Sequence, residues 1–300
     1  MNLKFDVIII GGSYSGLSAA MSLARSLRKV LILDSGLPCN RFSPHSHNFI
    51  TFDGEKPDVI SSKAKEQVLK YETVTFEQDE ALSGEKTKDG FAITTKKGHT
   101  YSAKKLLFAT GVRDVLPNIS GFAECWGKTI IHCPYCHGYE FKDAVTGIFA
   151  NGQKAFHVAT LVTNLTKSLV IVSSGEAEFT LEQRSILQKH SIDIIESKIT
   201  SVEQTNGAIQ SVVFEDGTKR SLSALYAALP FEQQTDIPKQ LGCEFTEFGH
   251  ISVDLFQKTT VPGIYACGDN STMMRSVAYA VSAGNIAGGM INHEISIEMF

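Results

Sequence analysis

Apolar and polar positions at the start of the chain follow two different periods. The run Val7–Ile10 is continuously apolar, which is typical of a strand that is buried on both faces. Two glycines follow, and the apolar positions of Ser15–Leu27 then recur with the spacing of an amphipathic helix. A second apolar run, Val30–Leu33, ends at Asp34. This order of strand, glycine turn, helix and strand predicts a nucleotide-binding unit.

The same pattern occurs a second time, with one important departure. An apolar strand ends at Ala150, where the first copy has a glycine, and a helix is predicted near Ala155–Asn164. The next strand, Leu169–Val172, ends at Ser173. The offset from turn to strand end is 23 positions in both copies, from residue 11 to 34 and from residue 150 to 173. The second copy therefore keeps the shape of the unit but has lost the glycine of its tight turn.

Each copy continues with the same kinds of element. A helix is predicted over Ser61–Tyr71 in the first copy and over Leu181–His190 in the second. An antiparallel meander follows, and then a strand, Leu106–Gly111 or Leu225–Leu229. The turns of the meanders are predicted at Lys97-Gly98, Asn206-Gly207 and Asp216-Gly217.

The end of the chain has no counterpart in the second copy. Val261–Asp269 is predicted to form one more strand, and a helix rich in small residues is predicted over Ser276–Asn292. We assign both to the first domain. The fold class is therefore α/β, with two Rossmann-like, doubly wound, three-layer domains. Residues 1–116 and 239–300 form the first domain, and residues 117–238 form a second domain inserted into it.

Composition restricts the functions further. The 300 residues carry a formal charge of −4, with 43% apolar and 20% charged residues, which is ordinary for a soluble globular protein. No cluster of Lys and Arg indicates nucleic-acid binding, and no apolar stretch is long enough to span a membrane. Six cysteines, four of them scattered singly, do not form a secreted disulfide framework. Because the first apolar run is too short for a signal peptide, we expect a cytoplasmic protein.

The first glycine turn is a candidate nucleotide site. Gly11, Gly12 and Gly16 precede a helix whose N-terminal amides can bind a pyrophosphate, although Ser13 replaces the middle glycine of the ideal pattern. Asp34 lies at the spacing from which an acid accepts hydrogen bonds from a ribose. The alternative is a glycine turn with a purely structural use.

Cys133-Pro134-Tyr135-Cys136 is the candidate reactive site. Two cysteines three residues apart at a helix start can close a small disulfide, and a helix N-terminus favours the thiolate. Two other interpretations remain open on the residues alone. With His137 the motif also fits covalent haem attachment, and with His132 and His137 it fits part of a zinc site.

These motifs together resemble the low-molecular-weight thioredoxin reductases, a branch of the FAD-dependent pyridine nucleotide-disulfide oxidoreductases. The resemblance rests on the turn at 11–16, on Ala109-Thr110-Gly111, on the cysteine pair in an inserted domain and on the segment 260–269, and it covers nearly the whole chain. It implies a homodimer that binds FAD and no metal. The FAD-binding residues would be Gly11, Gly12, Ser13, Ser15, Gly16, Asp34, Ser35, Arg41, Ala109, Thr110, Gly111, Gly268, Asp269, Ser276 and Val277.

The resemblance also implies roles for the residues around the cysteines. Cys136 would face the flavin, and Cys133 would exchange with the substrate. The family's reductases have an aspartate after the second cysteine as a proton donor, whereas this chain has His137. Because an imidazole titrates near neutrality, His137 could equally accept a proton from a dithiol. His132 is a further catalytic candidate, and His45 and His47 are expected on a surface loop near the pocket.

The second turn is a poor candidate for NADPH. The family's reductases carry a basic cluster that binds the 2′-phosphate of NADPH, but Ser173, Ser174 and Gly175 supply no charge. Glu176 and Glu178 would repel a phosphate. NADPH is therefore doubtful, unless other residues such as Lys154 or Lys167 bind it.

We expect an FAD-dependent oxidoreductase that oxidises a dithiol, with O2 or another acceptor reoxidising FAD. In this respect the chain is similar to the family's dithiol oxidases of the gliotoxin and holomycin type, which share a Cys-x-x-Cys-His motif. The substrate would be a small-molecule dithiol or disulfide, or a thioredoxin-like protein. The first alternative is an NAD(P)H-dependent thioredoxin-disulfide reductase, and the second is a flavin-based redox sensor.

Overall fold

The computed structural model describes residues 4–300, which divide by their contacts into two units. The first unit contains the chain up to Arg41, Asp58–Arg113 and Glu232–Phe300. The second contains Phe42–Pro57 and Asp114–Phe231. The boundaries expected from the sequence lie slightly farther along the chain, and nothing in the sequence pattern assigned residues 42–57 to the second unit. The chain crosses between the units four times, and at two of these crossings it runs through strands that pair with each other, β7 (Val112–Asp114) and β16 (Phe231–Gln233).

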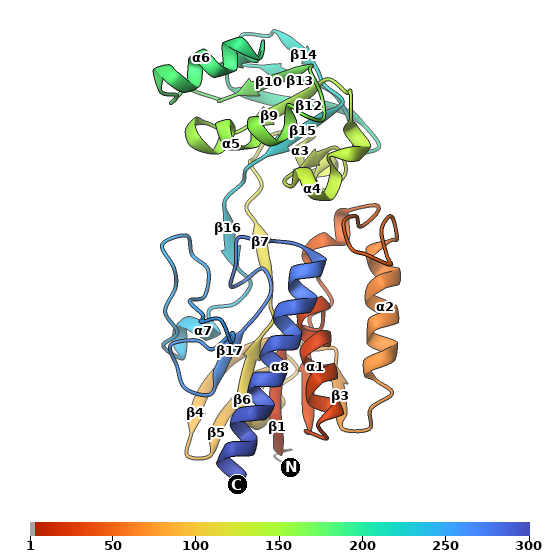
Figure 1. The fold of residues 1–300 in the computed structure, drawn as a ribbon, viewed down its shortest axis with the longest axis vertical. Helices are drawn as coiled ribbons and strands as arrows, with labels where there is room; N and C mark the ends of the chain where they lie inside the picture. The colour runs from red at the N-terminus through yellow and green to blue at the C-terminus, as the bar shows by residue number, and fades with distance from the viewer. Residues whose placement is uncertain (1–3) are drawn as a thin grey trace. The chain divides into compact units, whose positions relative to one another are not determined.

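A seven-stranded sheet is the centre of the first unit (Figure 1). Its parallel part has the order β3-β2-β1-β6, with β17 beside β6, and two antiparallel strands complete it. The strands are β1 (Lys4–Ile10), β2 (Val30–Leu33), β3 (Val74–Glu77), β4 (Ala81–Thr87), β5 (Gly90–Thr95), β6 (Thr100–Phe108) and β17 (Ile264–Ala266). The expected strand Val261–Asp269 is thus only three residues long, although the Gly263 carbonyl and the Cys267 N–H just outside it still bond to β6.

The two faces of this sheet carry two separate cores, since side chains alternate along a strand. Val7 and Ile9 pack with the apolar faces of α1 and α8, whereas Ile8 and Ile10 pack with residues of α7 on the opposite face. The helices of the unit are α1 (Tyr14–Arg25), α2 (Pro57–Val68), α7 (Ile237–Gln240) and α8 (Val277–Met299), with a short 3-10 helix η1 (Cys39–Phe42). The expected helices at Ser15–Leu27 and Ser61–Tyr71 are confirmed, with shifted ends.

Helices α1 and α8 lie side by side because small residues line their contact (Figure 1). A Cβ at Gly284 would lie 2.1 Å from the carbonyl oxygen of Ser15, and one at Gly288 would lie 2.6 Å from that of Ala19. The expected helix over Ser276–Asn292 is confirmed, but the predicted end at Asn292 is wrong. Helix α8 continues to Met299.

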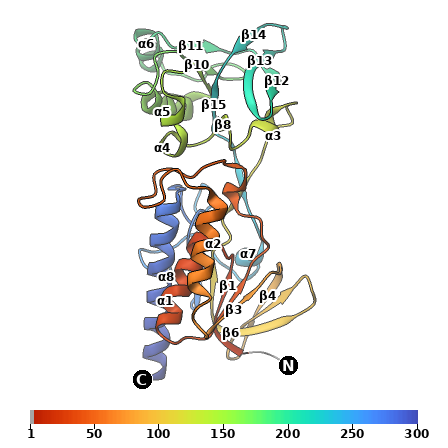
Figure 2. The ribbon, with the colours of Figure 1, turned by 90° about the vertical axis from the view of Figure 1, so that its right-hand side faces the viewer.

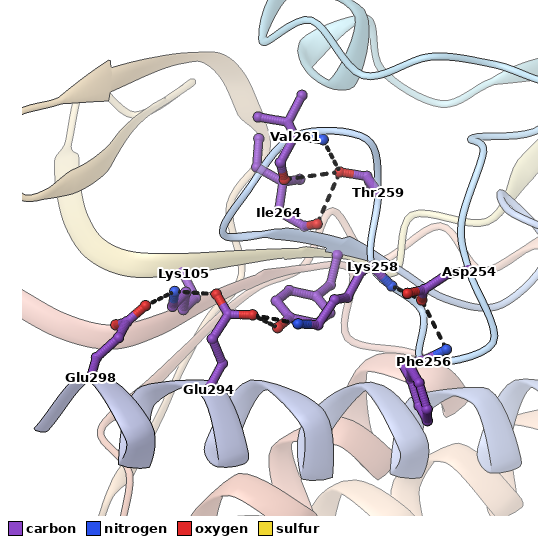
Figure 3. A network of polar contacts seen from close by, with 10 residues as sticks. Lys105, Asp254, Phe256, Lys258, Thr259, Val261, Ile264, Glu294 and Glu298 are labelled. Atoms are coloured by element: carbon purple, nitrogen blue, oxygen red, sulfur yellow. Dashed lines mark hydrogen bonds and ion pairs between the residues drawn. The ribbon is translucent and has the colours of Figure 1, made fainter. Parts of the chain in front are cut away.

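A buried ion-pair network explains why α8 continues (Figure 3). Lys105 on β6 is only 5% exposed, and its ammonium group donates to the carboxylates of Glu294 and Glu298, one turn apart on α8. Glu294 also accepts from the Tyr265 hydroxyl at 2.6 Å and from Lys258 at 2.8 Å. These contacts fasten the last turns of the helix to the sheet, beyond the end at Asn292 that the sequence pattern predicted.

The second unit contains a five-stranded parallel sheet, β11-β10-β9-β15-β8, and an antiparallel meander, β12-β13-β14 (Figure 2). The strands are β8 (Ile130–Ile131), β9 (Thr146–Phe149), β10 (Leu169–Val172), β11 (Asp193–Ile195), β12 (Ile199–Thr205), β13 (Ala208–Phe214), β14 (Lys219–Ser221) and β15 (Ala224–Ala227). The helices are α3 (Phe122–Cys125), α4 (Pro134–His137), α5 (Gly152–Val162) and α6 (Leu181–Lys189), with a 3-10 helix η2 (Tyr139–Phe141). The expected helices of this copy, the parallel sheet and the meander are confirmed.

The turn predictions are confirmed as well. Asn206 and Gly207 have φ values of 54° and 84° between β12 and β13, as a tight hairpin turn requires. The turns at Lys97-Gly98 and Asp216-Gly217 join β5 to β6 and β13 to β14. Within residues 4–300, no helix is both long enough and apolar enough to cross a membrane.

Candidate active site

The glycines of the first turn are required by close backbone packing between β1 and α1. Gly11 has a φ of +110°, and a Cβ on it would lie 2.2 Å from the carbonyl oxygen of Ala109. A Cβ at Gly16 would lie 1.9 Å from the carbonyl oxygen of Gly11. Neither position can hold a side chain without moving the backbone. The turn therefore brings the start of α1 directly against the ends of β1 and β6.

Asp34 lies at the end of β2, beside this turn. Its Oδ1 accepts a hydrogen bond of 3.0 Å from the backbone N–H of Gly12. Both residues line a cleft of about 610 Å³ in the first unit. Of the expected FAD-binding residues, those that line this cleft are Gly11, Gly12, Ser13, Asp34, Ser35, Ala109 and Thr110.

The cleft has a second wall that the sequence analysis missed. The connection after β3 and the turn before β6 supply Gln78, Asp79, Glu80, Lys96 and Lys97. Asp79 is buried, and its Oδ1 accepts from the backbone N–H of Glu80 at 2.8 Å. No motif marks these residues, because only the pairing of separate strands brings them to the cleft.

The other expected FAD-binding residues lie at the start of α1, after β6, around the start of α8 and in η1. Ser276 caps α8 by accepting from the N–H of Tyr279 at 3.1 Å, and Val277 is the first residue of the helix. Gly268 has a φ of +86°, and a Cβ on it would lie 2.7 Å from Oγ of Ser15. Gly111 follows β6 with a φ of +63°. Arg41, in η1, donates to the carbonyl oxygen of Pro38 at 2.9 Å.

A group of polar side chains near Asp269 was also missed. The Asp269 carboxylate lies 3.5 Å from Nε of Arg275, whose guanidinium group also contacts Sγ of Cys39 at 3.1 Å. Asn270 is fully buried and donates to the Phe108 carbonyl oxygen at 2.9 Å. Burial, and then the charge of Arg275, lower the pKa of His250. These side chains tie the segment after β17 to the end of β6.

The cysteine pair lies at the start of the one-turn helix α4 in the second unit. Cys133 is the N-cap residue, and Cys136 lies in the helix. Their sulfur atoms are 2.9 Å apart, and both residues are partly buried. The sulfur atoms need to approach by less than about 1 Å to form a disulfide bond. The expected position at a helix start is confirmed, although the helix has only four residues.

His137 ends α4, immediately after Cys136, and is partly buried. Burial is the main cause that lowers its pKa. The charge of Glu140 acts in the opposite direction, and the charge of His47 lowers the pKa further. The imidazole is therefore neutral at neutral pH and able to accept a proton.

The remaining histidine candidates differ in their surroundings. His132 and His45 are exposed. His47 is half-buried, with its Nε2 3.5 Å from Oε1 of Glu140 and its Nδ1 3.7 Å from Oδ1 of Asp53. Among residues 4–300, no three His, Cys, Asp or Glu side chains are grouped as metal ligands.

The second turn is closed by its own side chains. Oδ1 of Asn151 accepts from the N–H of Gly152 at 2.8 Å and from the N–H of Glu178 at 3.0 Å. Nδ2 of Asn151 donates to the Glu176 carbonyl oxygen at 2.8 Å. The hydroxyl of Ser173, at the position that corresponds to Asp34, donates to the Gly175 carbonyl oxygen at 2.8 Å. The N–H of Gly152 at this turn and the hydroxyl of Ser173 thus already have partners in the chain.

Comparison with known proteins identifies the family. A model of the pyridine nucleotide-disulphide oxidoreductases matches residues 5–284. The chain belongs to this family. It is 31% identical to thioredoxin reductase tcpT of Claviceps purpurea, over 98% of this chain and 95% of that protein. It is also 31% identical to thioredoxin reductase aclD of Aspergillus oryzae, over 94% of each chain.

Solved structures agree with this assignment. An oxidoreductase from Agrobacterium tumefaciens matches the model with a TM-score of 0.92 and 34% identity, over 98% of this chain and 99% of that one. The resemblance to the thioredoxin reductase-like family, the two-domain Rossmann fold and the assignment as an enzyme are therefore confirmed. The chain is an FAD-dependent oxidoreductase. The first cleft fits this cofactor, because it combines the glycine turn, the start of α1 and Asp34.

Proposed function

We propose that the protein oxidises a dithiol substrate to a disulfide, with Cys133 and Cys136 as its redox pair and His137 as its base. The second nucleotide turn carries this proposal. Asn151 accepts from the N–H of Gly152 at that turn and from the N–H of Glu178 on the loop after β10, and a Cβ at Gly152 would lie only 3.8 Å from the Glu178 carboxylate. A pyrophosphate at this helix start would have to displace one side chain and approach the negative charge of another.

The cysteine pair performs the exchange in two displacements. His137 accepts the proton of the first substrate thiol, and the resulting thiolate attacks Sγ of Cys133 in the disulfide form of the pair. The bond between Cys133 and Cys136 breaks, and Cys136 leaves as a thiolate. The second substrate thiol releases its proton to solvent, and its thiolate attacks the substrate sulfur of the mixed disulfide and releases Cys133 as a thiolate. The substrate loses two electrons, and the cysteine pair gains them.

When FAD is bound along Gly11, Gly12 and Asp34, it would serve as the two-electron acceptor for the reduced cysteine pair. O2 or another acceptor would be the final oxidant. The remaining chemistry rests on the chain itself. The 2.9 Å separation of the two sulfur atoms lets the pair alternate between dithiol and disulfide with little movement. The neutral imidazole of His137 is in the state that a base requires.

The relatives' names favour a second candidate, an NAD(P)H-dependent thioredoxin-disulfide reductase. In that reaction electrons pass in the opposite direction, from the nicotinamide to the cysteine pair and then to a thioredoxin-like protein. The nucleotide would then bind through residues other than the second turn, such as Lys154 or Lys167. Lys167 donates to the Thr163 carbonyl oxygen at 2.9 Å. A flavin-based redox sensor is a third candidate, which any measurable turnover would exclude.

The proposal includes the protein's organisation and surroundings. We infer a cytoplasmic homodimer whose FAD-binding domain consists of residues 1–116 and 239–300 and whose inserted domain carries the cysteine pair. The substrate is a small-molecule dithiol, because the exchange needs only two substrate thiols that can reach the Cys133–Cys136 pair and no protein partner. Sedimentation or light scattering of the flavin-loaded protein tests the dimer.

Oxygen consumption tests the activity. Flavin-loaded protein is mixed in air with dithiothreitol, and in parallel with NADPH and a thioredoxin. We expect oxygen uptake with the dithiol alone, and none after the replacement of either active-site cysteine by serine. Fast oxidation of NADPH that depends on thioredoxin would overturn the proposal in favour of the reductase.

A further inference from the structure

Two exposed tyrosines flank the second cysteine of the redox pair. Tyr135 lies between Cys133 and Cys136, and Tyr139 lies three residues after Cys136. They are 67% and 69% exposed, whereas the other six of the eight tyrosines are buried or partly buried. Tyrosine rings are typical of binding surfaces, because they combine a large apolar area with a polar hydroxyl. Two exposed rings beside the reactive sulfur atoms therefore indicate a surface that binds something.

The backbone holds both tyrosines on one side of the chain. The N–H of Gly138 donates to the Pro134 carbonyl oxygen at 2.8 Å, and Gly138 has helical φ and ψ values of −70° and −31°. Helix α4 and the 3-10 helix η2 therefore follow one continuous helical path. Residues four apart on such a path are neighbours, so Tyr135 and Tyr139 form one aromatic surface.

Close packing fixes this helical path against the second unit. A Cβ at Gly138 would lie 2.5 Å from Cδ1 of Leu165 and 3.0 Å from the hydroxyl oxygen of Tyr226 on β15. Phe141, at the end of η2, packs against a buried core cluster of the same unit. The two exposed rings thus stand on a base that is held in place, so a ligand can bind them with a small loss of conformational entropy.

The charges beside this aromatic surface are of opposite sign. The ammonium group of Lys142 lies 4.7 Å from the centroid of the Tyr139 ring. Glu140 follows Tyr139 directly, and its Oε1 is 3.5 Å from Nε2 of His47. Because a cation and an anion border the rings, the surface favours neither sign of charge in a ligand. An uncharged aromatic ring matches it, and can stack on the tyrosines.

The size of the aromatic surface favours a small molecule over a protein. An aromatic side chain has about 150–250 Å² of surface, so two rings that are about two-thirds exposed offer roughly 300 Å². A stable protein interface needs about 800 Å² from each partner. A thiol that attacks Cys133 also brings its carbon skeleton to the helical turn that carries Tyr135. The occupant that fits best is therefore the dithiol substrate itself.

We propose that Tyr135 and Tyr139 bind the ring of a small aromatic dithiol and so hold its thiols near Cys133. This inference rests on the proposed dithiol oxidation and names the class of its substrate. The two tyrosines supply binding, and the exchange itself remains with the cysteine pair. Stacking that is equally strong before and during the exchange lowers KM and leaves kcat unchanged.

Two dithiols that differ in their carbon skeleton test the substrate class. Both 1,2-bis(mercaptomethyl)benzene and dithiothreitol close a six-membered cyclic disulfide, but only the first carries an aromatic ring. Oxygen uptake by the flavin-loaded protein gives kcat and KM for each. We expect Tyr135→Ser and Tyr139→Ser each to lower the ratio of kcat/KM for the aromatic dithiol to kcat/KM for dithiothreitol by about tenfold, through KM.

Control variants separate the aromatic surface from general exposure. Tyr135→Phe keeps the ring and should keep the native ratio. Leu181, at the start of α6 in the same unit, is 88% exposed, and Leu181→Ser should leave the ratio unchanged. An unchanged ratio in both serine variants would overturn the proposal. Loss of thioredoxin reduction alone in these variants would also overturn it, because a protein would then be the ligand of this surface.

A binding measurement separates this proposal from the proposed function. The cyclic disulfide of the aromatic dithiol is titrated calorimetrically into the oxidised, flavin-loaded protein, which requires no turnover. We expect about tenfold weaker binding to Tyr135→Ser than to the native protein. If this difference is found in a protein that does not oxidise dithiols, the aromatic surface stands and the proposed oxidation fails. Equal binding in a protein that does oxidise dithiols would refute the surface and leave the oxidation standing.

Discussion

The two glycine-turn regions of this chain share one sequence pattern. They differ in whether a side chain of the protein already binds the backbone N–H groups at the turn. In the first, no side chain caps the start of α1 in the described structure, and the turn borders a cleft of about 610 Å³. In the second, Asn151 caps α5 and also binds the loop at Glu178. A duplicated unit can therefore keep its fold while it loses the surface that binds a ligand.

The acidic positions of the two regions show the same difference. Asp34 orders the first turn through Gly12 and still has a second carboxylate oxygen for a ligand. Ser173 is buried, and its hydroxyl donates within its own loop. The first region thus presents polar groups to a cleft, whereas Asn151 and Ser173 in the second region bind other groups of the chain.

The largest expected effect is at the cysteine pair. Cys133→Ser or Cys136→Ser removes one partner of the disulfide, so dithiol oxidation falls by roughly 10³-fold or more. Steady-state oxygen uptake measures this, with flavin absorbance as the check for a loaded enzyme. Cys243→Ser, in the core between the sheet and α7, is the matched control and keeps most of the rate. Full activity in Cys136→Ser would mean that electrons reach the flavin without the pair.

The second prediction concerns α8, which has no counterpart in the second copy. Lys105→Met leaves Glu294 and Glu298 without their buried partner, and we expect a loss of about 3 kcal/mol in the free energy of unfolding. This loss is at the lower end of the range of about 3–5 kcal/mol for breaking a buried ion pair, because both carboxylates are partly exposed. Urea denaturation measures it. A loss below about 0.5 kcal/mol would mean that the network does not hold the helix.

The same network predicts a dependence of stability on pH. Its hydrogen bonds from Lys105, Lys258 and Tyr265 outweigh the opposing effect of burial and lower the pKa of Glu294 to about 2. Because the folded-state pKa is below the unfolded value of 4.5, this stabilisation is present above pH 4.5 and is lost as the pH falls towards 2. Glu294→Gln should therefore flatten the acid side of the stability profile. An unchanged profile would exclude this role.

The third prediction compares glycines that differ in the space around them. Gly16→Ala places a Cβ 1.9 Å from a backbone oxygen, so we expect a loss of about 1–3 kcal/mol in stability, with reduced flavin content. Gly289→Ala, in α8, meets no atom within 4 Å and should instead stabilise the protein by about 1 kcal/mol. Thermal unfolding and flavin absorbance distinguish the two. Equal stability in both variants would contradict the packing argument.

The smallest effect is expected from opening the second turn. Asn151→Gly with Glu178→Gln frees two backbone N–H groups and removes one negative charge, so affinity for NADPH should rise by about tenfold or less. Replacing the cap by glycine costs only a few tenths of a kcal/mol. Calorimetric titration measures the affinity. If the native protein already binds NADPH more tightly than the variant, the second turn is a working site.

Sequence reasoning found those features that depend on local pattern. The strands Val30–Leu33 and Leu169–Val172 and the hairpin turn at Asn206 all follow from residue periods and turn chemistry. The end of α8 was wrong because Lys105, far away in the sequence, holds its last turns. Asp79 was missed for the same reason, and so were the contacts of His47 with Glu140 and Asp53. Contacts between distant segments bring them to their sites, and no local spacing encodes this.

An anaerobic half-reaction tests the central claim most directly. Flavin-loaded protein is mixed separately with NADPH, with NADH and with dithiothreitol, and the absorbance of oxidised flavin is followed by stopped flow. We predict rapid bleaching by the dithiol only, and return of the colour when air is admitted. Rapid bleaching by NADPH or NADH would contradict the account, because it would show that the closed second turn still delivers hydride to the flavin.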